Sequence, residues 1–334
     1  MKRATSAALV ALVAAIAQPG VAADYTLKVS SPTNNDSILK WMQGFEQRLE
    51  ESSEGAIDVQ LYPANQLGQI PATVEGIAMG TLEVTAPASG FFVQLDKRFE
   101  VLSVPGLFSD MAHAQRVLAD DAVLDRLSQY ANDQGVETIA AFPHGRLALV
   151  STKAVNAISD LEGQRIRVAG PTTLNTGPFK RLDASPLSMP LGEVLPAMQN
   201  GVVDGMIAGI PVFVLGRYYD VADTMTVLPE SYLVVTAVAS QAFLEAIGED
   251  LADQVRVAAR EALPEMNEWN LGMTARMEGL WEDNGGTVVT ISGDDAATYL
   301  DVISAVTIEA TNENATLEPE LDFLRAAAAR LADQ

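Results

Sequence analysis

Two arginines in one short apolar run are the residues whose type and spacing best suit ligand chemistry. The run QRIRV over 164–168 alternates polar and apolar side chains, which predicts a strand with Arg165 and Arg167 on one face. One interpretation is a solvated edge that carries two ordinary surface charges. The other is that one guanidinium points into a cleft, where two of its coplanar N–H groups donate to one carboxylate. Arg146, at the junction with the preceding strand, could supply a second positive group.

Catalytic and metal-binding signatures are scarce. The chain has no cysteine and two histidines, which excludes thiolate chemistry and leaves little for a histidine triad or metal site. His113 is expected to cap a helix or lie at the surface, and His144 to be structural or at a rim. No cofactor and no metal are expected. A pair of carboxylates, as in a secreted hydrolase, stays open as an alternative of another class.

Aromatic side chains offer a second kind of contact. Phe91 and Phe92 follow Ser89 and Gly90 at the end of a predicted strand, where α/β folds place ligand contacts. A core role and a ligand role are about equally supported for this pair. Phe213 is expected to be a core residue.

Composition bounds the class of protein. The chain has 334 residues, 48% of them hydrophobic, which is enough for roughly two domains of about 150 residues each. Its formal net charge of −23 repels phosphate backbones, so nucleic acid is not an expected partner.

The first 23 residues are predicted to be a cleaved secretory signal. Lys2 and Arg3 precede an apolar run over 7–17, and small residues end at Ala23. The run is too short for a membrane anchor. The mature chain is therefore expected to be soluble and periplasmic.

Strands and helices are predicted to alternate, which favours an α/β fold with a mostly parallel sheet. Strands are expected over 25–30, 56–62, 82–86, 137–142, 147–152, 165–169, 202–207 and 287–291. Helices are expected over 38–49, 70–79, 112–132, 174–182 and 193–200, with two more at the C-terminus. A helical stretch over 241–283, interrupted by Pro264, is long enough to bridge two lobes.

Three motifs carry a resemblance to a known family. They are YPANQLG over 62–68, DLEGQRIRV over 160–168 and PLGEVLPAMQNGVVDG over 190–205. In order and spacing they resemble the DctP-type solute-binding proteins of tripartite ATP-independent periplasmic (TRAP) transporters. The similarity covers essentially the whole mature chain.

The resemblance implies a two-lobed periplasmic-binding-protein fold with crossing strands and a long helix that bridges the lobes. Lobe I would comprise 24–146 plus about 233–272, and lobe II 147–232 plus about 273–334. It further implies no enzymatic activity.

Site residues also follow from the resemblance. Arg167 matches the arginine that binds the ligand carboxylate, and Arg146 resembles a second binding arginine displaced by one residue. Asn34 and Ser89 match positions near the cleft, and Glu230 falls where relatives often contact ligand. Gln66 is expected to support its loop.

Two departures bear on the ligand. In many relatives an asparagine three residues after the Gly of the Asp-Gly pair reaches the ligand, and here Ala208 occupies that position. Leu191 occupies the position of an aromatic residue in some sialic-acid binders. Both changes argue against sialic acid. The expected function is to bind a small organic acid and deliver it to a TRAP permease, with the protein acting as a monomer. The candidate ligands are a C4-dicarboxylate, a uronic or aldonic sugar acid, and a keto or hydroxy monocarboxylate. A sugar acid or related hydroxy acid is favoured, and an ectoine-like compatible solute is the alternative.

Overall fold

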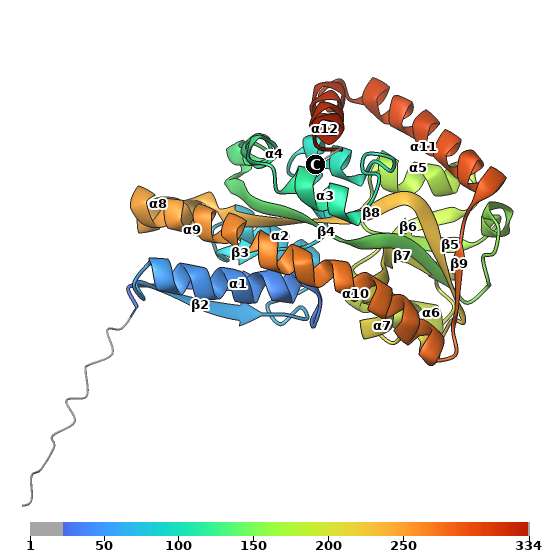
Figure 1. The fold of residues 1–334 in the computed structure, drawn as a ribbon, viewed down its shortest axis with the longest axis horizontal. Coiled ribbons are helices and arrows are strands. Elements are labelled where there is room, and N and C mark those ends of the chain that lie inside the picture. The colour runs from blue at the N-terminus through green and yellow to red at the C-terminus, as the bar shows by residue number, and fades with distance from the viewer. Residues whose placement is uncertain (1–22, 333–334) are drawn as a thin grey trace, which may run out of the picture.

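The computed structural model describes residues 23–332, in which one mixed sheet extends through two lobes (Figure 1). The strand order is β2-β1-β3-β8-β4-β7-β5-β6, and β9 pairs with β8 off this path. The strands are β1 (Tyr25–Ser30), β2 (Ile57–Tyr62), β3 (Val84–Thr85), β4 (Val136–Ser151), β5 (Arg165–Val168), β6 (Ser185–Ser188), β7 (Gly205–Gly209), β8 (Thr224–Ser240) and β9 (Thr287–Thr290). The predicted signal sequence falls on 1–23, of which 1–22 lie outside the described residues.

The α/β class is confirmed, but the centre of the sheet is antiparallel. Strands β4 and β8 pair from Val136 opposite Ser240 to Ser151 opposite Thr224, and so cross both lobes. The two strands expected over 137–142 and 147–152 are therefore one strand. β8 is not among the expected strands, because Pro229 and polar neighbours interrupt its apolar pattern.

Capping residues divide the helices more finely than the sequence pattern predicts. The single helix expected over 112–132 is two, because Asp120 accepts a hydrogen bond from the Val123 amide and starts a new helix. The stretch 241–283 breaks at Gly248 as well as at Pro264. The helices are α1 (Ser37–Ser52), α2 (Ile70–Ala78), α3 (Met111–Leu118), α4 (Asp121–Leu127), α5 (Thr173–Arg181), α6 (Leu191–Gln199), α7 (Ile210–Leu215), α8 (Gln241–Ile247), α9 (Glu249–Glu261), α10 (Leu263–Asp283), α11 (Gly293–Glu313) and α12 (Leu317–Leu331).

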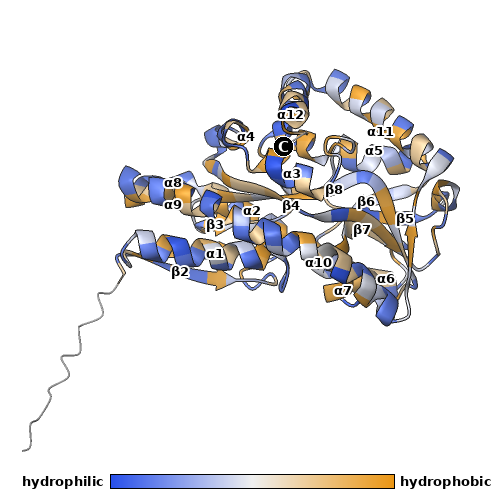
Figure 2. Cartoon of the chain, in the orientation of Figure 1, coloured by the Kyte–Doolittle hydropathy of each residue, from blue (hydrophilic) through white to orange (hydrophobic). Residues whose placement is uncertain are grey.

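Separate hydrophobic cores stabilise the two lobes. The core of the first lobe contains residues of β1, β2, α1, α9 and α12. In the second lobe, alternate residues of β4, β7 and β8 point to opposite faces of the sheet and belong to two separate cores. Figure 2 shows these apolar strands beneath more polar helices. Among residues 23–332, no helix has both the length and the apolar character that a membrane span requires.

Two long helices connect these cores. α10 buries Leu263 and Met266 in the first lobe and Met277 and Trp281 in the second, as the expected bridging helix would. α11 starts on the second lobe and leads to α12, which packs on the first. The expected division, which assigns 273–334 to lobe II, is therefore wrong for α12.

A buried carboxylate joins β5 to the chain that precedes β7. Asp204 accepts hydrogen bonds from the backbone amide of Arg165 at 2.8 Å and from its guanidinium at 3.0 Å, and Lys153 Nζ lies 3.1 Å away. The side-chain hydrogen bond from Arg165 outweighs burial and holds the pKa of Asp204 well below its usual 3.8.

We expect Asp204→Asn to lower the free energy of unfolding by about 1–3 kcal/mol at neutral pH, because the ionised form is the one the fold stabilises. A depressed carboxyl pKa adds stability that is present above the unfolded value and is lost as the pH falls. The difference from wild type should therefore shrink below about pH 4 in urea titrations. Asp220→Asn, which alters an exposed pair with Arg217, is the control and should change little. A pH-independent difference would contradict the assignment.

Candidate ligand-binding site

Arg167 is a deeply buried charge in the middle of the molecule. β5 carries it between the lobes, where it is 2% exposed. Its Nε and Nη2 both donate to the Met189 carbonyl at 3.0 Å, and no carboxylate in residues 23–332 forms an ion pair with it. Burial lowers the pKa of Arg167 to about 10, which leaves it charged at neutral pH. The interpretation of both arginines as surface charges is therefore wrong for Arg167.

A small cavity of about 30 Å³ lies against this guanidinium. Both lobes line it: the first lobe supplies helix starts and strand ends, and the second supplies β5, β7 and α7. The lining residues are Pro32, Thr33, Ile38, Ile70, Ala88, Phe91, His144, Arg167, Ala169, Leu191, Ala208, Val212, Leu233 and Val235. A site between lobes is where two-lobed proteins hold small ligands.

A buried acid–imidazole pair stands at one wall of this cavity. His144 Nε2 and Asp36 Oδ2 lie 2.9 Å apart, and both side chains are 1% exposed. Burial raises the pKa of Asp36, but the hydrogen bond and charge of His144, with the Leu39 amide, leave it below its usual value. Asp36 also caps α1 through the amides of Ile38 and Leu39. His144 Nδ1 has no hydrogen-bond partner among the described residues.

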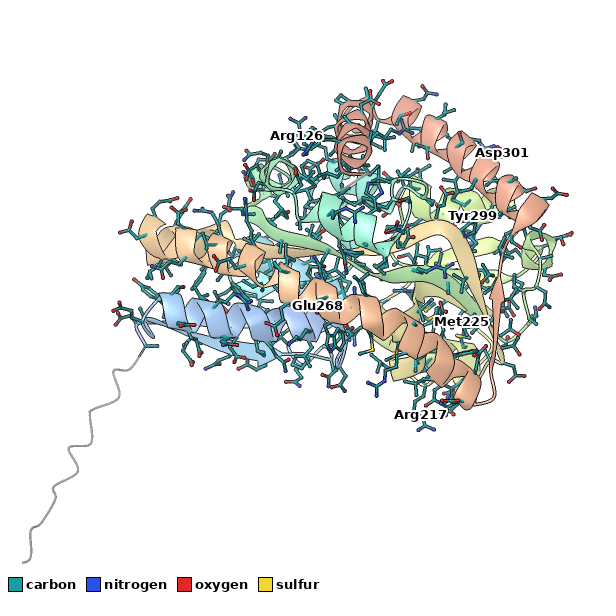
Figure 3. All side chains as sticks on the ribbon, in the orientation of Figure 1. Arg126, Arg217, Met225, Glu268, Tyr299 and Asp301 are labelled. Carbon is teal, nitrogen blue, oxygen red and sulfur yellow. The ribbon has the colours of Figure 1, made fainter. Side chains whose placement is uncertain are left out.

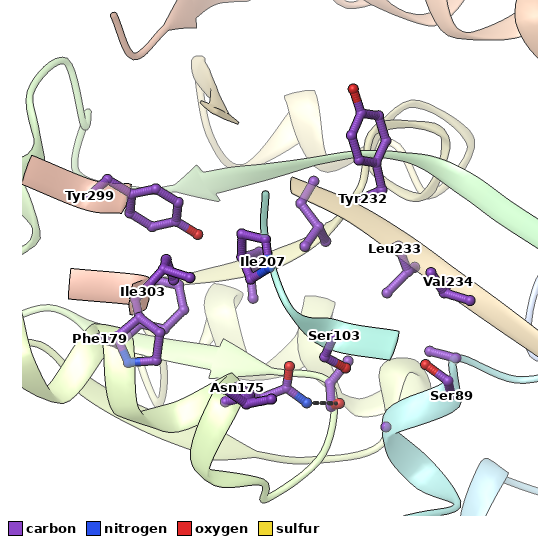
Figure 4. A pocket seen from close by; sticks show the side chains of 17 residues that line it. Ser89, Ser103, Asn175, Phe179, Ile207, Tyr232, Leu233, Val234, Tyr299 and Ile303 are labelled. Carbon is purple, nitrogen blue, oxygen red and sulfur yellow. Dashed lines mark hydrogen bonds between the residues drawn. The ribbon is translucent and has the colours of Figure 1, made fainter. Parts of the chain in front are cut away.

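A second cavity of about 40 Å³ continues the cleft on the other side of the central strands. It shares Ala88, Ala169 and Leu233 with the first cavity. Figure 4 shows the Tyr299 ring beside Ile303 and Phe179, with Ser89 on the opposite side. On α11, Tyr299 faces inward and Asp301 outward (Figure 3).

Direct contacts join the two lobes. Glu100 of the first lobe accepts a hydrogen bond at 2.8 Å from the Leu174 amide in the first turn of α5. A Cβ added at Gly90 would lie 2.7 Å from the Ala169 carbonyl, and one at Gly170 would lie 2.8 Å from the Gly90 carbonyl. Only glycine lets the two backbones approach this closely.

The structure brings together some of the predicted site residues. Arg167 and Phe91 line the first cavity and Ser89 the second. Asn34 lines a neighbouring open groove of about 370 Å³. Arg146 instead faces α10, with its Nη1 3.6 Å from Glu278 Oε1.

Glu230 lies apart from both cavities. It is exposed, with φ 46°, in an irregular part of β8, and its carbonyl accepts from the Gly106 amide at 2.8 Å.

The two histidines have largely the expected roles. His113 is buried and not at the surface, but its Nδ1 accepts from the Ser109 amide at 3.1 Å at the start of α3, and its Nε2 lies 2.9 Å from the Ala328 carbonyl on α12. His144 is part of the cavity wall, and its pairing with Asp36 joins positions 108 residues apart, which no local pattern reveals. Among the described residues, no group of three acidic or histidine side chains could hold a metal ion.

Two lobes that share a sheet, with an unpaired guanidinium in the cleft between them, define a two-lobed solute-binding protein. Comparison with known families agrees: the family described as bacterial extracellular solute-binding protein, family 7, or DctP, matches residues 29–314. The chain belongs to this family, whose members are binding proteins of transporters and not enzymes.

Relatives support the assignment over most of the chain. The 2,3-diketo-L-gulonate-binding periplasmic protein of Escherichia coli is 26% identical over 263 residues, which are 78% of this chain and 80% of that protein. The C4-dicarboxylate-binding periplasmic protein DctP of Vibrio cholerae is 23% identical over 295 residues, 88% and 87% of the two chains. A TRAP solute-binding protein from Xanthobacter autotrophicus, solved with β-D-galacturonate, has the same fold at a TM-score of 0.83. Its identity is 22%, and the match covers 90% of this chain and 99% of that one.

We expect Arg167→Met to raise the free energy of unfolding of the ligand-free protein by about 1–4 kcal/mol, because it removes a buried charge that has no counter-ion. Urea unfolding of protein freed of ligand by denaturation and dialysis measures this. Arg165→Met, two residues away on the same strand, should have the opposite sign because Arg165 is paired with Asp204. A loss of stability in Arg167→Met would mean that the guanidinium has a structural role.

Proposed function

We propose that this protein is a periplasmic receptor that captures a small organic acid between its lobes and delivers it, as a monomer, to a TRAP permease. One observation carries the proposal: the Arg167 guanidinium is buried at the cleft with no carboxylate to balance it. A ligand carboxylate supplies the missing charge and takes two parallel hydrogen bonds. The relatives named above, which bind diketogulonate, dicarboxylates or galacturonate, support an acidic ligand.

Binding proceeds by closure of the lobes around the acid. In the open state water reaches Arg167, and in the closed state water is excluded and the charge pair strengthens. The irregular pairing of β4 with β8 near Pro143, Arg146 and Ala148 is a suitable hinge. Phe91 and Ser89 close over the ligand from the first lobe, and Asn34 lies at the groove leading in. Arg146 pairs with Glu278 of α10 beside this hinge.

The alternatives have less support. A cationic or zwitterionic solute such as ectoine requires acidic groups, yet no Asp or Glu lines either cavity in the described chain. The nearest carboxylate, Asp36, is already paired with His144. Hydrolysis by two carboxylates lacks its residues for the same reason.

The binding test is a thermal-shift screen of wild type, Arg167→Met and Arg167→Lys against organic acids. An acid at 100 times its dissociation constant should stabilise wild type by about 2.7 kcal/mol, a rise in Tm of several degrees. Arg167→Met should show no shift, and Arg167→Lys a reduced one, because lysine keeps the charge without the planar fork. Equal shifts in all three proteins would overturn the proposal.

We expect Gly90→Ala to weaken acid binding about tenfold or more, since its methyl group would clash with the Ala169 carbonyl only when the lobes are closed. Calorimetry gives the affinity, and small-angle scattering with saturating acid should show a larger radius of gyration than wild type. Gly279→Ala is the control, because a Cβ there meets nothing within 4 Å. Unchanged affinity in Gly90→Ala would contradict closure through this contact.

A further inference from the structure

We infer that the acid is a monocarboxylate with an apolar remainder, not a polyhydroxylated sugar acid or a dicarboxylate. This rests on the proposed function, because it concerns the same cleft. It selects the monocarboxylates from the candidate ligands of the sequence analysis and sets aside the sugar acid favoured there. Two features of the cavity beside Arg167 carry it: its hydrocarbon lining and its single cation.

Hydrocarbon dominates the lining. Only Thr33, His144 and Arg167 bring polar side chains to the first cavity, and the remaining lining residues are aliphatic, aromatic or proline. The second cavity is also mainly apolar, with Ser89, Ser103, Asn175, Tyr232 and Tyr299 as its polar side chains. An apolar tail would gain about 0.8 kcal/mol per buried CH₂ in such surroundings.

Hydroxyl groups would be costly here. A sugar acid carries several hydroxyls, and each one buried without a partner costs about 1–3 kcal/mol. In the second cavity, Asn175 already donates to the Ala169 carbonyl at 2.9 Å. Leu191 and Ala208 present only hydrocarbon to the first cavity. This cavity, which contains the Arg167 guanidinium, can therefore satisfy a carboxylate but not a ring of hydroxyls.

A dicarboxylate is disfavoured by charge. Arg167 is the one cation that lines either cavity in the described chain. Arg146, the nearest candidate for a second carboxylate, is turned toward Glu278 at 3.6 Å. A second carboxylate buried without a counter-ion would lose more solvation energy than an apolar group of the same size.

Calorimetric titration of the whole mature chain with four six-carbon acids and one C4-dicarboxylate tests the inference. The probes are 4-methyl-2-oxopentanoate, 2-hydroxy-4-methylpentanoate, D-galacturonate and D-gluconate, with succinate as the dicarboxylate. We expect one of the first two to bind at least tenfold more tightly than the other three, and to lose binding in Arg167→Met.

The outcomes separate the two proposals. Tighter binding of galacturonate, gluconate or succinate that still requires Arg167 overturns the apolar acid and leaves the receptor function standing. Binding that is equal in wild type and Arg167→Met, or no binding of any acid, overturns the receptor function and this inference with it.

A substitution in the lining gives an independent test. Leu191 packs against the cores of both lobes and lines the cavity, so Leu191→Asn should weaken binding of the preferred apolar acid about tenfold. Leu271→Asn, at an exposed position of α10, is the matched control and should leave the affinity unchanged. Circular dichroism confirms that both variants are folded. Unchanged affinity in Leu191→Asn would overturn the apolar contact.

Discussion

The antiparallel pairing of β4 with β8 is the constraint on which the rest of the structure depends. Because these strands cross both lobes, each lobe completes its sheet on the same two strands and neither has a separate framework. The bulges near the middle interrupt the pairing without ending it. The buried pair of Asp36 and His144 joins α1 to β4 beside the same point, so the cavity next to Arg167 lies close to these bulges.

Burial of Arg167 shows how binding and stability oppose each other in this fold. A charge without a counter-ion weakens the ligand-free protein, and a lowered pKa is the sign of that cost. On α12, Glu320 accepts hydrogen bonds from both Arg126 and the Tyr130 hydroxyl at 2.8–2.9 Å. Glu100 and Arg167 are buried with backbone partners alone among the described residues, and of these two Arg167 lines the cavity between the lobes. In the function proposed above, Arg167 is the charge that an external partner balances.

Local patterns predict the local elements well and the distant contacts poorly. Alternation and capping predict β1, β2, α1 and α2 nearly to the residue, and the RIRV run places Arg167 on a strand. The length of β8 and the direction of Arg146 depend on chain far away in the sequence. Glu278, which orients Arg146, belongs to α10, and Asp36 meets His144 across 108 residues. Such pairings leave no mark in the spacing of neighbouring residues, so the full cavity wall required the folded chain.

The passage of α10, α11 and the β4–β8 ribbon between the lobes has a mechanical consequence. A twist of one lobe about the long axis of the molecule would stretch one of these connections and compress another, and helices resist both. Bending at the strand bulges strains them far less. In the closure proposed above, bending at the bulges is therefore the movement that these connections oppose least. Selectivity in such a closure comes from how well a solute fits the cavity between the lobes, since the lobes have little freedom to adjust to a poor fit.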